Sequence, residues 1–152
     1  MKKRLPSGQY FYYDERDKKL VDSFKWHIVG GYVQTEIGSR KDGTRKTLRL
    51  HRLILQPKQT EIIDHINRNP LDNRRSNLRI CNKSQNGMNR GRQNNNTTGY
   101  KGVSLHKPTG KFRAYITVNG KTQHIGLFDT ANIAHKKYLN KSRELHKEFS
   151  CV

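Results

Sequence analysis

The sequence predicts an α+β protein of two small units: a β-rich N-terminal part and a C-terminal three-stranded antiparallel sheet packed on one helix. Three observations indicate this class. Only 32% of the 152 residues are hydrophobic, which is too few for one large core. Short segments rich in β-branched and aromatic residues alternate with Gly, Asn and Asp turn signals. A polar, Asn-rich segment, 91–99, separates the two parts as a linker.

The first 60 residues are predicted to be β-rich. Turn signals at Gly30-Gly31 and at 41–43 divide them into short strands. Trp26 and Tyr32 are expected to pack across a hairpin, because core packing is the commoner use of such rings than stacking on bases. The predicted strands are 21–26, 32–37 and 47–55.

Residues 60–90 predict the order strand, loop, strand, helix. Ile62 and Ile63 form a short buried strand, and 78–81 forms a second. Between these strands lies a polar loop rich in Asn and Arg. Asn82 has the side chain of a helix N-cap, and Gln85 stands three residues on as its capping-box partner.

The C-terminal unit, 100–152, is predicted as three strands and a helix. Asn119-Gly120 is a strong hairpin signal, and 108–110 is a second turn. Thr130 caps a helix of about 131–147 with an apolar side. The predicted strands are 100–106, 111–118 and 121–128.

The charge of the chain predicts a polyanionic partner. Lys and Arg number 31 against 12 Asp and Glu, a net charge of +19, and 1–50, 51–90 and 91–152 are each net positive. This pattern favours nucleic acid over a merely over-charged soluble protein. No run approaches the ~18 apolar residues of a membrane span, and no apolar stretch follows the basic N-terminus, so neither a span nor a signal peptide is expected. Cys81 and Cys151 are isolated, which favours a reducing compartment.

Asp64 and His65, at the end of a predicted strand, could form a hydrolytic site. Asp64 offers an oxygen ligand for Mg²⁺, and His65 offers a base with a pKa near neutrality. At a strand end both side chains can turn toward one cleft. Asn86 could complete the metal site, and Asn77 could accept the other ring N–H of His65. The alternative is a surface loop held by Asn-mediated turns.

Alternation along the C-terminal strands predicts two faces. One suits the helix and comprises Val103, Leu105, Phe112, Ala114, Ile116, Val118, Ile125 and Leu127. The other is polar and basic, and comprises Ser104, His106, Lys111, Arg113, Tyr115, Thr117, Thr122 and His124. A flat basic face can enter the major groove of DNA, and an ordinary solvated sheet face is the alternative.

Four sequence blocks surround and include the Asp64-His65 pair. They are His-Arg-Leu-Ile-Leu at 51–55, Ile-Asp-His-Ile-Asn-Arg-Asn at 63–69, Leu-Asp-Asn-Arg-Arg-Ser-Asn-Leu-Arg at 71–79 and Ser-Gln-Asn at 84–86. In this order and spacing they resemble the HNH endonucleases of phage and intron origin, the homing type. The resemblance covers about 20–90 and implies a ββα-metal finger at about 60–90 within a nuclease domain of 1–90.

The resemblance implies a role for each site residue. His65 is similar to the general base that deprotonates the attacking water, and Asn77 to the residue that orients it. Asp64 and Asn86 are similar to the ligands of one divalent ion per site, Mg²⁺ or Mn²⁺, with Asn86 where other members have His. The implied reaction nicks DNA and leaves a 5′-phosphate and a 3′-hydroxyl.

The basic and histidine residues near this site have two interpretations. Arg68, Arg74, Arg75 and Arg79 could contact phosphates or only solvate the loop, and phosphate contact is favoured for Arg74 and Arg75. His51 is expected to be a strand histidine with a structural hydrogen bond, although it could line the cleft.

The C-terminal strings also carry a resemblance. They are Gly-Tyr-Lys-Gly-Val at 99–103, Gly-Lys-Phe-Arg-Ala at 110–114 and His-Ile-Gly-Leu-Phe-Asp-Thr at 124–130. They resemble the Apetala/ethylene-response-factor (ERF) DNA-binding domain over about 97–150. The groove-facing positions that this implies are Lys101, Ser104, His106, Tyr115, Thr117, Thr122 and His124. The linker is flanked by Arg90 and Arg92, which are expected to bind DNA, and could follow the minor groove.

The leading hypothesis is a site-directed, metal-dependent DNA endonuclease whose C-terminal sheet holds double-stranded DNA. The alternative is a non-cleaving DNA-binding transcriptional regulator on the same scaffold. An RNA-binding protein is less favoured, because no aromatic platform motif is present. No membrane or protein partner is implied, and a monomer is expected because no coiled-coil heptad occurs. The resemblance implies a phage-encoded protein in the cytoplasm of a bacterial host.

Overall fold

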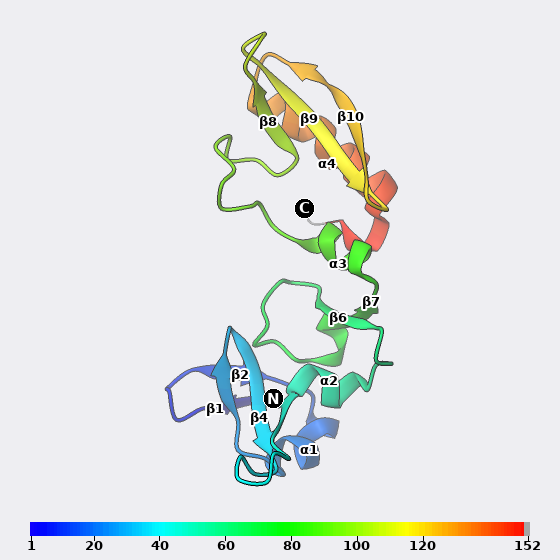
Figure 1. The fold of residues 1–152 in the computed structure, drawn as a ribbon. Helices are drawn as coiled ribbons and strands as arrows, with labels where there is room; N and C mark the ends of the chain where they lie inside the picture. The colour runs from blue at the N-terminus through cyan, green and yellow to red at the C-terminus, as the bar shows by residue number, and fades with distance from the viewer. Residues whose placement is uncertain (151–152) are drawn as a thin grey trace. The chain divides into compact units, whose positions relative to one another are not determined.

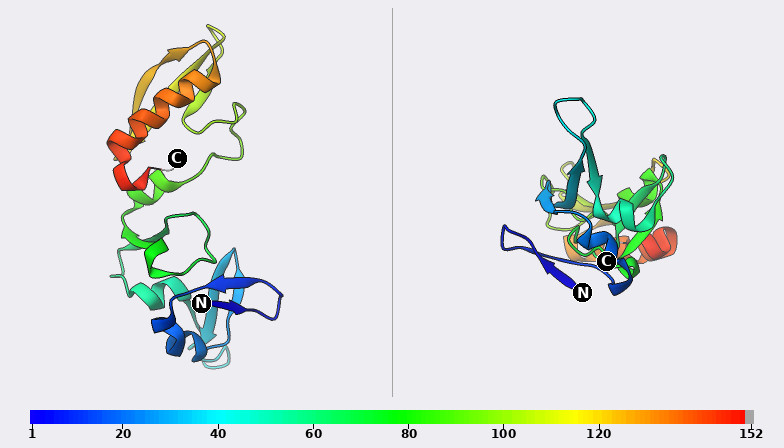
Figure 2. Two further views of the ribbon diagram at one scale, coloured as in Figure 1. Left: turned by 180° about the vertical axis from the view of Figure 1, so that it is seen from behind. Right: turned by 90° about the horizontal axis from the view of Figure 1, so that it is seen from below.

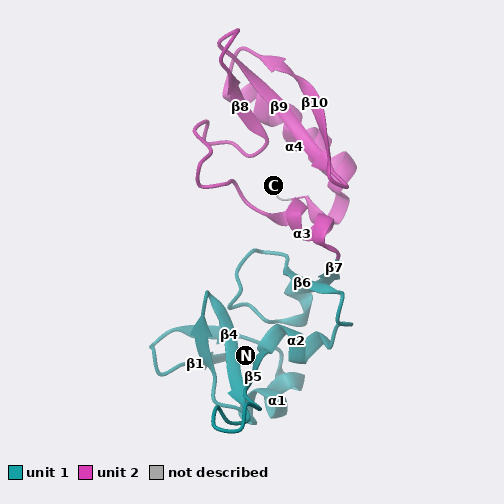
Figure 3. Cartoon of the chain, viewed as in Figure 1, with its two compact units in different colours: residues 1–81 teal, residues 82–152 magenta. Residues whose placement is uncertain are grey.

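The structure is a computed structural model that describes residues 1–150, so Cys151 lies outside the described residues. The chain forms two compact units, Met1–Cys81 and Asn82–Val152 (Figure 3). The helix after Asn82, α3 (Lys83–Asn89), groups with the second unit because it packs against that unit's central strand and its last 3-10 turn. The nuclease domain of 1–90 that the sequence predicts has a different boundary and stays a prediction.

The first unit combines three small antiparallel sheets with two short helices (Figure 1). The sheets pair β1 with β2, β3 with β4 and β5, and β6 with β7. Their core is a single apolar cluster that includes Phe11, Val21, Trp26, Val33 and Leu50. The elements are β1 (Lys2–Arg4), β2 (Tyr10–Tyr12), α1 (Lys18–Asp22), β3 (His27–Val29), β4 (Tyr32–Ile37), β5 (Lys46–Arg49), α2 (Leu50–Leu55), β6 (Ile62–His65) and β7 (Leu78–Cys81), with 3-10 turns at Glu15–Asp17 and Arg75–Asn77.

Two of the predicted N-terminal strands are wrong. Residue 21 lies on α1, and the chain becomes extended only at β3. The segment 47–55 is half strand and half helix, because β5 ends at Arg49 and α2 begins at Leu50. Leu50 and Ile54 both face the core, and their spacing of four is that of one helix face. β-Branched and aromatic content had favoured a strand in both segments, whereas core packing selects a helix.

The aromatic residues of the first unit divide between core and site. Trp26 is buried, with its ring centroid 6.5 Å from that of Phe11 and 5.7 Å from that of Phe24. Its indole N–H donates to the carbonyl of Val21 at 2.7 Å, which satisfies the one polar group of this buried ring. The predicted core role of Trp26 is confirmed, whereas the ring of Tyr32 lies against two histidines.

In the second unit one face of a three-stranded sheet is covered by a long helix (Figures 1 and 2). The strands are β8 (Val103–His106), β9 (Lys111–Val118) and β10 (Lys121–Phe128), in the order β10-β9-β8, and the helix is α4 (Ala131–His146), followed by a 3-10 turn at Lys147–Phe149. Both predicted helix caps are confirmed: Asn82 and Gln85 form a capping box, and Thr130 accepts from the Ile133 amide. No helix among residues 1–150 is long and apolar enough to cross a membrane.

A β-bulge changes the predicted face of one residue. The pairing of β9 with β10 shifts between His124 and Gly126, so Leu127 lies opposite Arg113 and Phe128 lies opposite Phe112. Leu127 therefore belongs to the outer, basic face, and Phe128 takes its place against the helix. The prediction that Leu127 faces the helix is wrong, because alternation counted along the sequence cannot detect a bulge.

Replacing Gly102 by alanine should destabilise the second unit by about 2–3 kcal/mol. The backbone of Gly102 has a φ of +72°, and an added Cβ would lie 2.2 Å from Cδ2 of Tyr138. Chemical denaturation of the full chain measures the loss. The matched control is Gly110→Ala, at a φ of +68° with nothing within 4 Å, which adds backbone strain alone. An equal loss in both variants would contradict the packing argument.

Candidate active site

The ribbon of β6 and β7 positions the candidate catalytic residues. The antiparallel register places Asp64 opposite Arg79 and His65 opposite Leu78. Neighbouring side chains on a strand point to opposite faces, so Asp64 and His65 meet different neighbours. Both residues are buried. The sequence-based expectation that both turn toward one cleft stays a prediction.

Asp64 is neutralised by an arginine of the partner strand. Arg79 donates to Oδ2 of Asp64 from Nε at 2.8 Å and from Nη2 at 2.7 Å. The two side chains are only 15% and 7% exposed, for Arg79 and Asp64 respectively. A buried carboxylate needs such a partner, because an isolated buried charge is costly. Arg79 thus pairs with Asp64, and its predicted phosphate contact stays a prediction.

The His65 ring packs against the rings of His51 and Tyr32 and lies within hydrogen-bond distance of the Asn73 side chain. Its Nε2 lies 3.4 Å from Oδ1 of Asn73, a long hydrogen bond. Its ring centroid lies 5.2 Å from that of His51, nearly perpendicular at 88°, and 6.2 Å from that of Tyr32. Burial lowers the pKa of His65, and this effect exceeds the opposing influence of Asn73, Asp64 and Asp72. The imidazole is therefore neutral at pH 7.

The loop between β6 and β7 is held by asparagine side chains. Asn77 accepts from the Asn67 amide at 2.9 Å and donates to the carbonyl of Asp72 at 2.7 Å, so both ends of its amide hold the loop. The side-chain oxygen beside the His65 ring is that of Asn73. The orienting role that the resemblance implies for Asn77 stays a prediction, and Asn73, in the same 71–79 block, has no role in that expectation.

His51 is the site residue that sequence reasoning placed incorrectly. It lies on α2, not on a strand, and is 5% exposed. Its Nδ1 is buried and has no hydrogen-bond partner among residues 1–150, which contradicts the expected structural hydrogen bond. Burial, with smaller contributions from His65, Arg49 and Arg52, lowers the pKa of His51 to about 3. The four-residue spacing of the apolar Leu50 and Ile54 is the sequence signal that indicates a helix at His51.

The loop arginines pair with buried carboxylates. Arg75 donates to Asp17 at 3.0 and 2.7 Å, which ties the loop to the N-terminal part of the unit. Arg74 donates to Asp72 at 2.8 and 2.7 Å, yet its side chain stays 50% exposed. Arg68 is exposed. Of the loop arginines predicted to contact DNA, Arg68 and Arg74 thus present the most accessible side chains.

The outer face of the second unit brings its predicted residues together. The register aligns Ser104 with Arg113 and His106 with Lys111 across β8 and β9. Across β9 and β10 it aligns Tyr115 with His124 and Thr117 with Thr122, whose hydroxyls lie 2.9 Å apart. Lys101 lies elsewhere, because its ammonium donates to the carbonyl of Met88 on α3 at 2.6 Å.

A basic groove lies within the second unit. Its volume is about 890 Å³, and it runs between α3, the segment that follows α3, and β9. Four cationic side chains line it, together with the ring of Tyr115. They are Lys83, Arg90, Arg92 and Lys101. The groove thus gathers Arg90 and Arg92, which flank the linker and are predicted to contact DNA.

The donor set for a metal ion is small. No group of three or more His, Cys, Asp and Glu side chains able to hold a metal occurs in the described part of the chain. Mg²⁺ suits such a set, because it keeps several waters and takes substrate phosphate oxygens beside one or two carboxylates. Asp64 supplies a buried carboxylate of this kind. The second predicted ligand, Asn86, lies on α3 in the second unit.

Comparison with known proteins shows the family. A sequence model described as HNH endonuclease matches residues 49–88. Protein 3.8 of Escherichia phage T7 is 34% identical over 88 residues, which cover 58% of this chain and 72% of that protein. The uncharacterized HNH endonuclease L560 of Acanthamoeba polyphaga mimivirus is 30% identical over 139 residues, 86% of this chain and 67% of that protein. The chain belongs to the HNH endonuclease family. No solved structure gives a significant match.

The match covers the residues that the geometry singles out. The segment of this HNH endonuclease that fits the family contains α2, β6, the Asn-rich loop, β7 and most of α3. The protein is a nuclease and hence a hydrolase, and members of its family generally use a divalent metal ion. The mixed α/β class with small antiparallel sheets is confirmed. The ββα-metal arrangement, the homing type and the ERF-like domain stay predictions.

Proposed function

We propose that this HNH endonuclease hydrolyses phosphodiesters of double-stranded DNA with His65 as its general base. The observation that carries the proposal is the buried His65 ring at the end of β6, whose Nε2 lies 3.4 Å from Oδ1 of Asn73. In a neutral imidazole one nitrogen donates and the other accepts. With Nε2–H donating to Asn73, Nδ1 is the nitrogen that takes the proton of a water.

The residues around His65 support this proton transfer. Asn73 Oδ1 accepts from Nε2 both before and after Nδ1 is protonated, so it keeps one tautomer and then stabilises the imidazolium. His51 and Tyr32 pack against the ring, which limits its rotation and excludes water from its faces. Asn77 holds the loop that carries Asn73, and its role in orienting His65 is therefore indirect in this proposal.

Asp64 and Asn86 are the proposed ligands of one Mg²⁺ or Mn²⁺ ion, on the strength of the family resemblance. Such an ion, when bound, offsets the negative charge that develops on the phosphate oxygen and on the leaving 3′ oxygen. Arg79 pairs with the Asp64 carboxylate at 2.7 Å, which compensates the charge of this buried side chain. The proposed products are a 5′-phosphate and a 3′-hydroxyl, and a single site in a monomer nicks one strand.

The second unit is proposed to hold the DNA. Its outer sheet face combines hydroxyl, imidazole and cationic side chains, and Arg113 lies 5.7 Å over the ring of Tyr115. Arg90 and Arg92 add charge from the segment after α3. Such contacts fix the register of a duplex on a protein, and base-edge contacts from the sheet would add sequence preference.

The test is nicking of a supercoiled plasmid library with random inserts, in Mg²⁺, in Mn²⁺ and in excess chelator. We expect nicks that require the divalent ion, carry 5′-phosphate ends and cluster at one sequence. Binding without nicking in either metal would contradict the proposal and favour the DNA-binding regulator. Cuts that persist in chelator would contradict the metal requirement alone.

A further inference from the structure

The N-terminal hairpin presents a face that the catalytic proposal does not use. In the β1–β2 pair, Lys2 lies opposite Tyr12 and Arg4 lies opposite Tyr10. Directly opposed residues share a face, so these four side chains lie on one side of the hairpin. Phe11 points the other way, into the core, and is fully buried. Tyr10 and Tyr12 are 43% and 39% exposed, so both rings are accessible from solvent.

Cations lie over both exposed rings. The ammonium of Lys2 lies 5.1 Å from the centroid of Tyr10, and the guanidinium of Arg74 lies 5.9 Å from that of Tyr12. A cation stacked on a ring is held in place, yet it keeps donors for an anion. We call these five residues, Lys2, Arg4, Tyr10, Tyr12 and Arg74, the hairpin face.

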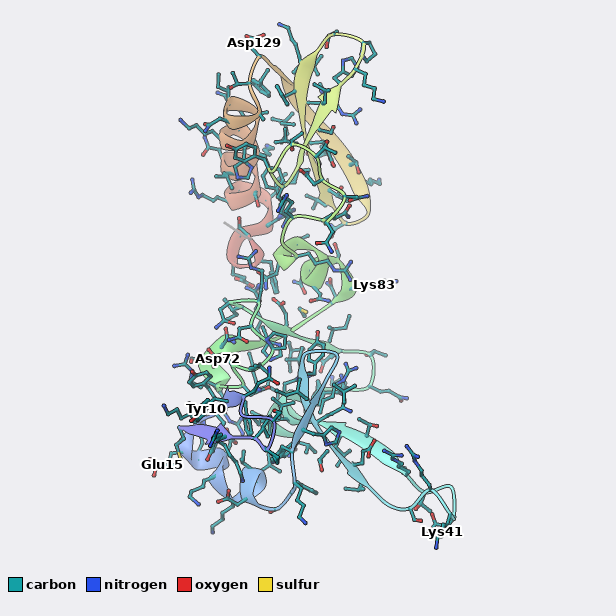
Figure 4. The ribbon with its side chains drawn as sticks, turned by 90° about the vertical axis from the view of Figure 1, so that its left-hand side faces the viewer. Tyr10, Glu15, Lys41, Asp72, Lys83 and Asp129 are labelled. Atoms are coloured by element: carbon teal, nitrogen blue, oxygen red, sulfur yellow. The ribbon has the colours of Figure 1, made fainter. Side chains whose placement is uncertain are left out.

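The hairpin face is joined by hydrogen bonds to the loop beside His65. The amide of Tyr12 donates to the carbonyl of Leu71, and the amide of Asn73 donates to the carbonyl of Tyr12, both at 2.8 Å. Asn73 is the residue whose side chain lies against His65. Figure 4 shows Tyr10 and Asp72 at one side of the first unit and Lys41 at the opposite side. Asn73 thus links the hairpin face to the proposed base, because its backbone bonds to Tyr12 and its side chain lies against His65.

We propose that the hairpin face binds the sugar–phosphate backbone of the DNA strand next to the phosphodiester that is cut. This inference rests on the proposed function. Lys2 and Arg4 are exposed cations, and Arg74 stays half-exposed although it pairs with Asp72. Such cations can bind phosphates, and the two phenols can donate to phosphate oxygens. Contacts of this kind are electrostatic and independent of sequence, so they position the strand at His65 rather than select the target.

The test measures how DNA binding by the full chain depends on salt. The probe is a labelled duplex in Mg²⁺, and every protein carries His65→Ala to limit cleavage. The double variant Lys2→Ser, Arg4→Ser should bind about tenfold more weakly near 0.1 M salt, and the slope of log affinity against log salt should fall by about 2. Tyr10→Leu should also weaken binding, with an unchanged slope.

The matched control is Lys41→Ser, Lys46→Ser, which removes the same charge from the β4–β5 hairpin of the same unit. Smaller losses of affinity and slope in the control than in the hairpin variant would support the proposal. Equal losses would overturn it, because net charge alone would then explain them, and no loss in the hairpin variant would overturn it directly. Nicking by the parent protein is scored separately, so failure of the proposed function is visible as absent nicking whatever the hairpin variants do.

Discussion

Replacing His65 by alanine should lower the rate of DNA cleavage by about 10²- to 10⁴-fold, the contribution of a positioned general base. The ring is buried and neutral, and one nitrogen lies against Asn73, so the variant removes the proton acceptor without removing a charge. Affinity for DNA should change only by a factor of a few, because the proposed DNA contacts lie on other residues. Single-turnover nicking and a binding assay on the same preparations measure the two effects.

A second histidine of the same unit provides the control. His27 is exposed on β3, and His27→Ala should leave the nicking rate unchanged. Asn73→Ala should slow nicking by less than His65→Ala. It removes the acceptor that favours one tautomer of His65, but the imidazole itself remains. Cleavage by His65→Ala at the parent rate would remove His65 from its assigned role. A large loss of binding in that variant would instead assign the ring to DNA contact.

The elements that local chemistry determines could be predicted from the sequence. The capping box of Asn82 and Gln85, the Asn119-Gly120 turn and the strand of Leu78–Cys81 each depend on residues close together in the chain. The helices α1 and α2 were missed, because each has fewer than seven residues and its apolar side is selected by a core assembled from distant segments. The bulge in β10 was likewise invisible, because pairing with β9 defines it.

The site was predictable as a set of residues but not as a set of contacts. Asp64 and His65 were found through their neighbours in the sequence. The pairing of Asp64 with Arg79 follows from cross-strand register, which one strand alone does not reveal. The proximity of His51 to His65 requires α2 to pack against the ribbon of β6 and β7, and no residue near His51 in the sequence indicates this packing. Local sequence pattern therefore identifies the candidate site residues, whereas long-range packing determines which side chains contact them.

Replacing His51 by phenylalanine should make the protein more resistant to acid. The pKa of His51 falls from its ordinary value of 6.5 to about 3 because the ring is buried. Between these two values the unfolded chain binds a proton that the folded protein does not, so the free energy of unfolding rises with pH. The stability is fully present above about pH 6.5 and is lost as the pH falls toward 3, by about 1.4 kcal/mol per pH unit.

Phenylalanine keeps the ring volume but cannot be protonated. It also removes the buried Nδ1 that lacks a partner, so stability at pH 7 should be unchanged or higher. Between about pH 6 and pH 4 the variant should lose about 2–3 kcal/mol less than the parent, measured by urea denaturation at each pH. The lowered pKa of His65 acts in the same direction and remains in both proteins. If the stability of parent and variant falls equally with pH, protonation of His51 does not destabilise the folded protein. That result would contradict the role of His51 as a neutral ring that supports His65.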